Sequence, residues 1–331
     1  MKKIAVVILN WNGVELLRQF LPSVLQFSTE ATIYVIDNAS TDVSVSVLKS
    51  EFPTVQIIEN EGNFGFAKGY NEGLKTIKEP YLALVNSDIE VTKNWLQPIL
   101  NQFEKDTLTA IIQSKILDFK NKSYFEYAGA AGGFIDKYGY PYCRGRIFDK
   151  IEEDKGQYDS SINIFWASGA CFFIRNQVFQ ELQGFDEGFF AHQEEIDLCW
   201  RAHHMGYEIK FCYQSVVYHV GGATLNNESP RKTYLNFRNS LYMLTKNLPK
   251  NTLVPILFSR LLLDGIAAFR FLTQGKFKHL IAILRAHFHF YSNFKDYYSK
   301  RNSQNIKKYY TISSIVNRFF IQKQQTYTKL F

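Results

Sequence analysis

Short apolar segments alternate with helix-like segments over the first hundred residues, and this alternation restricts the possible folds more than any other feature of the chain. The apolar segments are rich in Ile, Val and Leu, as parallel strands buried on both faces are. They occupy residues 4–9, 33–37, 55–58 and 81–85. Helical spacing of apolar residues follows at residues 13–27, 40–50 and 63–77. The pattern predicts an α/β fold, a doubly wound and mainly parallel sheet flanked by helices, with Ser40 or Thr41 capping the second helix.

Polar side chains follow three of the predicted strands directly. Asn10 follows the first strand, Asp37 and Asn38 end the second, and Asn86-Ser87-Asp88 follows the fourth. Open α/β sheets bind ligands at the carboxyl ends of their strands. An Asp held there can bind a divalent cation, which in turn can carry a diphosphate. A turn or a helix cap is the alternative role of Asp88, since Asn, Ser and Asp all favour turns.

The phosphate-binding fingerprints of the commoner nucleotide-binding folds are missing. No GxGxxG follows the first strand, where Asn10-Trp11-Asn12-Gly13 stands, and the chain has no GxxxxGK[ST]. Dinucleotide redox chemistry and P-loop hydrolysis are therefore poorly supported. A nucleotidyltransferase is also a weak hypothesis, because no Gly-rich and basic loop follows the first strand.

The middle of the chain changes character. Residues 114–160 lose periodicity and gain Gly and Tyr, which predicts loops and short β elements that form a partly mobile flap over the site. A strand at residues 168–174 and a short helix at 176–182 follow. The pattern then predicts a longer helix from Glu194 to about Gly206.

Acidic side chains gather at the start of this longer helix. Glu194 and Glu195 stand in its first turn, where the helix dipole stabilises carboxylates without any further function. A general base must stay ionised in the site, and a partly screened carboxylate at a helix start can also do that. Asp197 and Arg201 are four residues apart, so a salt bridge on the helix explains this second pair.

A single histidine, His219, ends the predicted strand at residues 215–218. A lone His at a strand end is usually structural. The glycines at 221 and 222 free the backbone for close approach to a ligand, which makes His219 a candidate metal ligand or phosphate contact. Positive and polar groups suited to a diphosphate leaving group follow downstream, at Arg231, Lys232, Arg238 and Asn239.

The net charge of +7 is unevenly distributed. From residue 245 onward, 15 Lys and Arg stand against two acids, Asp264 and Asp296. This predicts a catalytic domain at residues 1–245 and a basic, amphipathic helical region at 246–331. Helices with an apolar face and a basic face lie in the membrane interface and prefer anionic lipid. The alternative is a packed appendage or a dimer interface with a solvated basic face.

Motifs that are missing from the sequence restrict where the protein is located and what it binds. The four cysteines form no CxxC pair, which fits a reducing compartment. The first apolar run is too short for a signal peptide, and no run of 18 apolar residues predicts a membrane span. We expect a cytoplasmic protein, peripheral at the inner face of the membrane. No nucleic-acid-binding motif accompanies the positive charge, so we expect no nucleic acid partner.

Taken together, these motifs resemble those of family 2 glycosyltransferases, and most of all the rhamnosyltransferase-like branch of bacterial polysaccharide synthesis. The resemblance covers about residues 3–245 and keeps the motifs in the family's order. They are Asn10-Trp11-Asn12-Gly13, Asp37 to Asp42, Asn63 to Asn71, Asn86-Ser87-Asp88, Gly184-Phe185-Asp186, Glu194 to Leu198, His219 to Gly222 and Arg238-Asn239.

The resemblance implies a GT-A fold and an inverting transfer of sugar from a nucleotide diphosphate donor. It implies Asp88 and His219 as ligands of Mg²⁺ or Mn²⁺, with the family's DxD-type motif reduced to Asn-Ser-Asp. The family's Glu-Asp pair maps onto Glu194-Glu195, which makes Glu195 the candidate base and leaves the choice between the two glutamates open. The implied substrate and nucleotide contacts are Asn10, Asp37, Asn38, Asn63, Gly65, Phe66, Gly69, Asn71, Asn86, Asp186 and Arg238.

Two functional hypotheses result. The first is an inverting, metal-dependent sugar transferase that uses a nucleotide-diphosphate sugar, with dTDP-rhamnose as the first guess, and a glycan or lipid-linked acceptor. The second is a non-catalytic module that binds a nucleotide sugar or serves assembly, which the reduced metal motif and the unusual Glu195 would suit. The sugar, the nucleotide, the linkage and the oligomeric state stay open.

Overall fold

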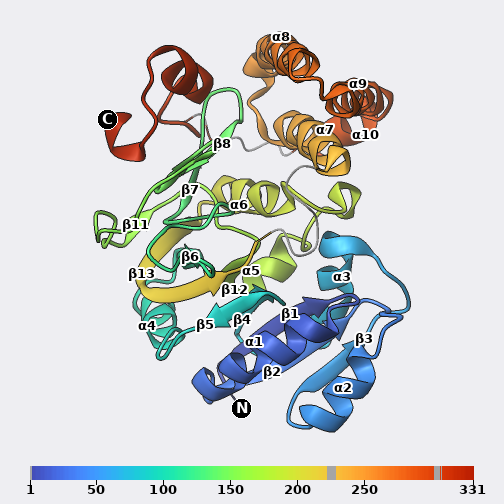
Figure 1. Ribbon diagram of the computed structural model, residues 1–331, viewed down its shortest axis with the longest axis vertical. Helices are drawn as coiled ribbons and strands as arrows, with labels where there is room; N and C mark the ends of the chain where they lie inside the picture. Colours follow the sequence, from blue (N-terminus) through green and yellow to red (C-terminus); the bar gives the residue numbers. More distant parts are fainter. Residues whose placement is uncertain (1, 222–228, 302–305, 307) are drawn as a thin grey trace.

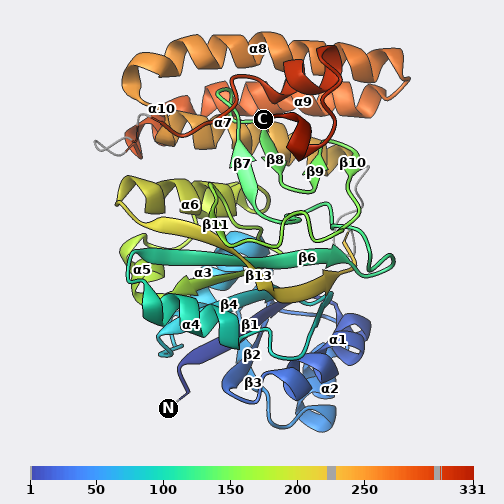
Figure 2. The ribbon, with the colours of Figure 1, turned by 90° about the vertical axis from the view of Figure 1, so that its left-hand side faces the viewer.

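The computed structural model describes residues 2–221, 229–301, 306 and 308–331 (Figure 1). Its centre is a nine-stranded sheet with the strand order β11-β13-β6-β12-β4-β1-β2-β3, in which β5 pairs with β13. Figure 2 shows helices beneath and above this sheet and a layer of long helices at one end of the molecule. The predicted α/β architecture with a mainly parallel sheet is therefore confirmed.

The first half of the sheet follows the predicted alternation. Its four neighbouring strands run parallel, and they are β1 (Ile4–Asn10), β2 (Ala31–Asp37), β3 (Gln56–Glu59) and β4 (Tyr81–Asn86). The helices between them are α1 (Val14–Phe27), α2 (Ser44–Glu51) and α3 (Gly65–Leu74). The predicted cap of α2 was wrong, since α2 begins only at Ser44. The Ser40 hydroxyl instead donates a hydrogen bond to Asp37, at 2.6 Å.

The second half of the sheet contains a long strand, β6 (Thr109–Asp118), that the sequence did not predict. The elements are β5 (Ile89–Val91), α4 (Gln97–Lys105), β6 (Thr109–Asp118), β11 (Ile162–Asn163), β12 (Cys171–Arg175), α5 (Asn176–Glu181), α6 (Glu194–His204) and β13 (Glu208–His219). Strand β12 runs antiparallel between β4 and β6. Residues 114–118 were assigned to a flap, but they lie in the buried strand β6.

A smaller sheet covers the large one beside the C-terminal segment. It consists of β7 (Gly133–Ile135), β8 (Pro141–Cys143), β9 (Arg146–Ile147) and β10 (Lys150–Ile151), which confirms the predicted short β elements. Tyr142 and Ile147 form an apolar cluster with Ile312, Ile315 and Phe319. The short helices η1 (Glu187–Phe189), η2 (Asn317–Ile321) and η3 (Tyr327–Lys329) complete the described chain.

The end layer is built from α7 (Pro230–Asn247), α8 (Lys250–Thr273), α9 (Phe277–Ser292) and α10 (Phe294–Ser299). Arg301 donates hydrogen bonds to the carbonyls of Thr245 and Leu248, so packing is continuous across the predicted boundary at 245. The division into two domains stays a prediction.

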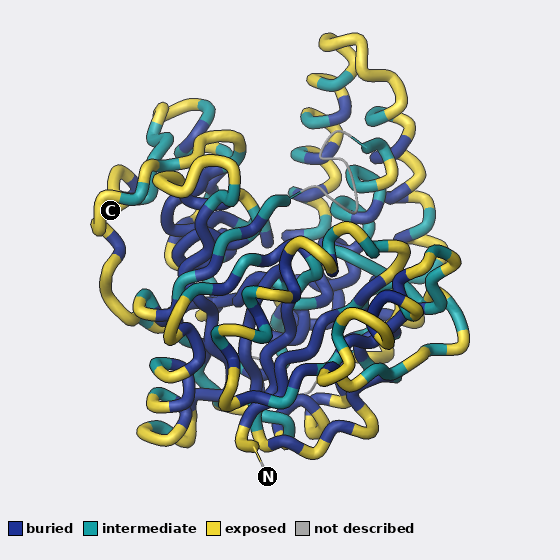
Figure 3. The backbone as a smooth tube through the Cα atoms, turned by 60° about the horizontal axis from the view of Figure 1, so that its bottom comes forward, coloured by how far each residue is buried: buried dark blue, intermediate teal, exposed yellow. Residues whose placement is uncertain are grey.

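Helix α8 buries Leu253, Ile256 and Ala268 but also carries large apolar side chains on its outer side. Arg260 and Asp264 are buried on its inner side, whereas Phe258, Ile266 and Phe269 are each more than 60% exposed. Figure 3 shows the buried sheet and the exposed outer turns of the end layer. Among the described helices, α8 alone is long enough and apolar enough to cross a membrane. The sequence had predicted no such span. Length and composition alone support a span, which is weak evidence.

Candidate active site

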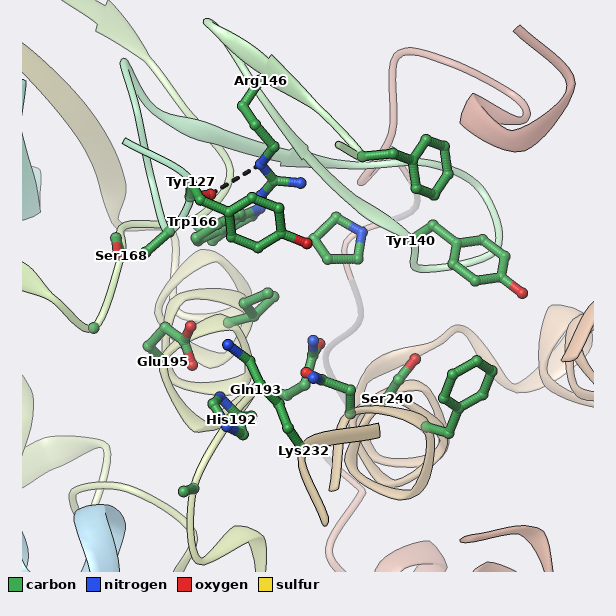
Figure 4. Close-up of a pocket in the computed structure, with 18 of the residues that line it drawn as sticks. Tyr127, Tyr140, Arg146, Trp166, Ser168, His192, Gln193, Glu195, Lys232 and Ser240 are labelled. Atoms are coloured by element: carbon green, nitrogen blue, oxygen red, sulfur yellow. Dashed lines mark hydrogen bonds between the residues drawn. The ribbon is translucent and has the colours of Figure 1, made fainter. Parts of the chain in front are cut away.

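A cavity of about 1990 Å³ lies between the carboxyl edge of the large sheet, the small sheet and the helices α6, α7 and α8. Pockets for one small ligand measure about 300–1,000 Å³, so this cavity has room for two substrates. Figure 4 shows Glu195 and His192 on one side of it, facing Arg146, Tyr127 and Trp166 on the other. Asn10, Asn38, Asn86 and Asp88 line it at the sheet edge.

Asn10 is held so that its amide oxygen is left without a partner. Its Nδ2 donates to Asp37 Oδ1 at 3.0 Å and to Ser40 Oγ at 3.2 Å, and a carboxylate requires a donor at that position. The buried Oδ1 has no hydrogen-bond partner among the described residues. A Cβ at Gly13 would lie 2.5 Å from this oxygen, so the missing side chain keeps the space beside it open.

Asn38 fixes the loop that precedes α3. Its Nδ2 donates to Asn63 Oδ1 at 3.1 Å and to the Gly65 carbonyl at 3.0 Å, and its Oδ1 accepts from Asn60 at 3.0 Å. Asn38, Asn63, Gly65 and Phe66 all line the cavity. The resemblance grouped these residues as nucleotide contacts, and the structure brings them together.

The loop before α6 has an unusual backbone. Phe190, His192 and Gln193 have φ values of 66°, 69° and 73°, in the left-handed region that non-glycine residues rarely adopt. Asn239 of α7 stabilises this loop, because its Nδ2 lies 2.7–2.9 Å from the carbonyl oxygens of residues 189, 191 and 192. The Phe190 carbonyl accepts from the amide of Phe66 at the start of α3.

The loop delivers Glu194 and Glu195 to the cavity wall, each with a buried Oε2 that has no hydrogen-bond partner among the described residues. Burial and the neighbouring charge of Glu195 raise the pKa of Glu194 well above its usual value. Burial also raises the pKa of Glu195, to about 7, although backbone N–H groups at the helix start oppose it. A carboxylate with a pKa near 7 can accept a proton at neutral pH.

Asp88 and His219 meet at the neighbouring strand ends. Asp88 Oδ1 lies 3.1 Å from His219 Nε2, and both side chains are buried. On the other side of the ring, Glu126 Oε2 lies 3.2 Å from Nδ1, within ion-pair distance but without hydrogen-bond geometry. Burial lowers the pKa of His219, but Glu126 and Asp88 outweigh burial and raise it to about 10.

The ligand types of this pair would suit a divalent cation. A carboxylate oxygen and an imidazole nitrogen are both ligand types that divalent ions such as Mn²⁺ accept. Metal binding requires the neutral imidazole, so a cation here would displace the proton that Asp88 and Glu126 stabilise on His219. Among the described residues, no three His, Cys, Asp or Glu side chains form a metal site by themselves.

Five of the implied nucleotide contacts do not line the cavity. They are Asp37, Gly69, Asn71, Asp186 and Arg238. Asp37 lies behind Asn10, and Gly69 packs against Asn38. Asn71 bonds to the backbone of Phe185 through both ends of its amide, at 2.8 and 2.9 Å. These residues support the site from outside it.

Asp186 and Arg238 also bond to protein groups. Asp186 accepts from Lys246 at 2.7 Å and from Lys300 at 2.8 Å, and Arg238 donates to the carbonyls of Gly188 and Phe189. Burial raises the pKa of Asp186, but the two lysines outweigh burial and lower it to about 2. The sequence predicted that Arg238 binds the diphosphate. In the structure the Arg238 guanidinium instead stabilises the turn that precedes Glu194.

Lys246 also joins the predicted pair of Asp197 and Arg201. Arg201 donates to Asp197 at 2.8 Å, which confirms the salt bridge, and Lys246 and Asn247 donate to the same buried carboxylate at 2.8 Å each. This network ties α6 to α7. All of the charged groups in this network are paired with other protein groups.

Sequence reasoning missed the part of the site between β6 and β12. Glu126, Tyr127 and Arg146 lie in the segment assigned to a flap, and Trp166 and Ser168 precede β12. Arg146 donates to the Tyr127 carbonyl at 2.9 Å (Figure 4). The available signal was the density of aromatic, basic and Gly residues in 124–146. Gly222, one of the glycines after His219, lies outside the described residues.

Comparison with known proteins agrees with this geometry. The model of the family described as "Glycosyl transferase family 2" matches residues 5–183, more than half of the chain. The low-salt glycan biosynthesis hexosyltransferase of Haloferax volcanii is 23% identical over 84% of this chain and 87% of its own length. The N-acetylglucosaminyl-diphospho-decaprenol L-rhamnosyltransferase of Mycobacterium tuberculosis is 22% identical over 55% of this chain and 64% of its own length.

Two solved structures share the fold. The mannosyltransferase of Pyrobaculum calidifontis in complex with GDP-Man and Mn²⁺ superposes with a TM-score of 0.53 and 13% identity, over 90% of this chain and 83% of that one. GalNAc-T7 with UDP, GalNAc and Mn²⁺ gives 0.59 and 18%, over 76% of this chain and 49% of that one. The fold is thus of the GT-A type. The chain belongs to glycosyl transferase family 2 and is a glycosyltransferase that uses a nucleotide sugar donor.

Proposed function

We propose that this enzyme is an inverting, cation-dependent glycosyltransferase that adds a sugar to a glycan or lipid-linked acceptor in the synthesis of a cell-surface polysaccharide. One observation carries the proposal. Glu195, with an unpartnered oxygen and a pKa of about 7, and the Asp88–His219 pair line the same cavity. The family membership favours this transferase over the non-catalytic binding module.

The donor is a nucleoside diphosphate sugar bound along the edge formed by β1, β2 and β4. The unpartnered Asn10 oxygen is suited to a nucleobase N–H group, which uracil, thymine and guanine all carry. The first donor to test is dTDP-rhamnose, which the resemblance suggested and which the mycobacterial relative's name as a rhamnosyltransferase supports. Asp37 would act on the nucleobase only indirectly, by holding Asn10.

The transfer is a single displacement. Glu195 removes the proton from an acceptor hydroxyl while that oxygen attacks the anomeric carbon of the donor sugar. A new carbon–oxygen bond forms as the bond from the anomeric carbon to the diphosphate breaks, and its electron pair leaves with the diphosphate. Attack from the face opposite to the leaving group inverts the anomeric centre. Glu194, whose pKa is also raised by burial and by the charge of Glu195, is the alternative base.

Asp88 and His219 would hold the Mg²⁺ or Mn²⁺ ion, which neutralises negative charge on the diphosphate when bound. Both similar structures are complexes that contain Mn²⁺, which supports a divalent cation here. The exposed apolar face of α8 and α9 supports a cytoplasmic enzyme held peripherally on an anionic membrane.

A thermal-shift screen tests the donor site. UDP, dTDP and GDP are each added with Mn²⁺ and with EDTA. A ligand at about 100 times its Kd should stabilise the folded protein by about 2.7 kcal/mol. We expect a shift with one diphosphate that disappears in EDTA and in Asp88→Asn. Absence of a shift with all three would contradict the proposal.

A matched pair of variants tests the base. Glu195→Gln keeps the size of the side chain and should lower kcat by about 10²–10⁴-fold while nucleotide binding stays unchanged. Glu194→Gln should retain most of the rate. If the two outcomes are exchanged, Glu194 is the base; full activity in both variants would sink the mechanism.

A further inference from the structure

The cavity has a second end that the donor does not need. The donor edge is polar, with Asn10, Asn38 and Asn63. At the other end the cavity opens between α8 and the C-terminal segment that contains η2, where apolar side chains of both segments line it together with polar ones such as Arg270, Arg318 and Gln322. We call this end the apolar arm, and its lining includes Leu262, Leu263, Ile266, Val316, Phe320 and Ile321.

We propose that the apolar arm binds the hydrocarbon chain of a lipid-linked acceptor and that the acceptor sugar enters the site from this end. The inference rests on the proposed function, since it narrows the acceptor class of that same site. Glu195 lines the cavity between the two ends. With a nucleotide sugar along β1, β2 and β4, the arm is the other end of the same cavity, and an acceptor hydroxyl that enters there would approach this carboxylate.

Exposure of the arm argues for a partner that arrives from an apolar phase. Leu262, Ile266 and Ile321 are 56%, 65% and 72% exposed although they line the cavity. The arm continues into the outer face of α8, where Val254, Phe258 and Phe269 are 63–72% exposed. Exposed apolar side chains on a helix that lies flat in a membrane interface insert among acyl chains. A hydrocarbon chain could thus pass into the arm from the bilayer without crossing water.

Helix α8 is anchored so that it lies on a membrane instead of crossing it. Arg260 on its inner side pairs with Asp264 at 3.2 Å and donates to the Tyr138 carbonyl and to Ser240. Asp264 also accepts from Tyr140 at 2.8 Å and lies 3.1 Å from His287. Insertion of α8 across a bilayer would break this network and place both charges in lipid, which is costly. The network keeps the wall of the arm in place.

Charge along the arm favours a lipid phosphate over a second copy of the chain. The Arg270 guanidinium lies 4.9 Å from the ring centre of Phe320, and Arg318 also lines the arm. Acidic side chains are scarce nearby, since Asp264 is buried and already paired. Two copies facing each other here would bring positive charges together, whereas the anionic headgroup of a prenyl phosphate complements them.

Fluorescence titration with two dansyl-labelled prenyl monophosphates tests the proposal. Geranylgeranyl phosphate has a C20 chain and geranyl phosphate a C10 chain, and excess dTDP or another diphosphate from the thermal-shift screen blocks the donor site. We expect the C20 probe to bind at least about tenfold more tightly, because the longer chain buries more apolar surface. Equal affinity for the two probes would overturn the proposal.

Two double variants separate the arm from the outer surface. Leu262→Gln/Ile266→Gln changes two lining residues that are 56% and 65% exposed, and Ile281→Gln/Leu284→Gln changes two residues of α9 outside the arm that are 52% and 60% exposed. The first should weaken C20 binding at least about fivefold, and the second should leave it unchanged. Equal effects of the two would overturn the proposal.

The nucleotide measurements distinguish the two levels of inference. If the C20 probe binds but no nucleoside diphosphate does, the proposed transfer reaction is contradicted and the proposal of a lipid-binding arm is retained. If a nucleotide binds but the two probes bind equally, the proposal of a lipid-binding arm is contradicted and the proposed transfer reaction is retained.

Discussion

At the scale of the residue, the site depends on polar atoms that the protein leaves unpaired. The amide oxygen of Asn10 and one carboxyl oxygen each of Glu194 and Glu195 are buried without a partner among the described residues. A buried polar group without a hydrogen bond costs about 1–3 kcal/mol. Such groups at the wall of one cavity are therefore expected where a ligand supplies the missing partner.

The pKa of Glu195 predicts a pH profile. The base acts in its deprotonated form, and burial raises its pKa to about 7. The value of kcat/KM should therefore fall about tenfold per unit as the pH drops below about 7, and it should level off above. Initial rates from pH 5.5 to 8.5 measure this, with Glu194→Gln expected to keep the acid limb. A flat wild-type profile would be inconsistent with Glu195 as the base.

Asn239 is predicted to position the loop that precedes Glu194 and Glu195. Asn239→Ala removes the donor that holds the carbonyls of residues 189, 191 and 192. We expect the free energy of unfolding to fall by about 1–3 kcal/mol and kcat to fall more than KM changes. Urea denaturation and steady-state kinetics measure both. The exposed Asn251→Ala should change neither quantity, and an unchanged kcat in Asn239→Ala would show that the loop holds without it.

At the scale of the element, α6 is positioned by buried charge. Lys246 of α7 bonds to Asp186 and Asp197, so it joins the turn before η1 to both helices. Sequence spacing predicted the Asp197–Arg201 pair because both residues lie on one helix. It could not predict Lys246, since that contact depends on the packing of two helices 49 positions apart in the chain.

Lys246→Met should destabilise the protein by about 3 kcal/mol, because it leaves buried carboxylate charge less well paired. Chemical denaturation gives the change in the free energy of unfolding. Lys250→Met, at the exposed start of α8, is the matched control and should change it by less than about 0.5 kcal/mol. A loss as small as the control's would mean that Arg201 and Asn247 satisfy Asp197 alone.

At the scale of the whole molecule, the sequence predicted the first half of the sheet well and the second half poorly. Strands β1 and β4 are apolar up to their last residue, so their pattern is clear. Strand β6 carries Gln113, Ser114 and Lys115, which are buried but bonded to the Gly129 carbonyl, Ser215 and Asp154. Partners distant in sequence satisfy these groups, so the strand resembled a loop. Glu126 was missed because it lies in an irregular segment and its neighbour His219 is distant in sequence.

The outer face of the end layer predicts membrane binding. The protein should float with phosphatidylglycerol vesicles and less with phosphatidylcholine vesicles, since α8 and α9 also carry exposed basic residues such as Arg270, Lys278 and Arg285. Phe258→Glu/Phe269→Glu should reduce flotation strongly. Val43→Glu, at the 56% exposed residue before α2, should not, because α2 lies at the opposite end of the molecule from α8 (Figure 1). Equal flotation of all three proteins would contradict this prediction.

The left-handed backbone before α6 has a consequence for laboratory evolution. His192 and Gln193 hold φ values of 69° and 73° at a cost of about 1–2 kcal/mol each, which glycine would not incur. Selection for thermal stability alone should therefore enrich glycine at these two positions. Such variants would gain melting temperature while the greater freedom of the loop lowers turnover. Screens that reward heat resistance and sugar transfer together should retain the native residues.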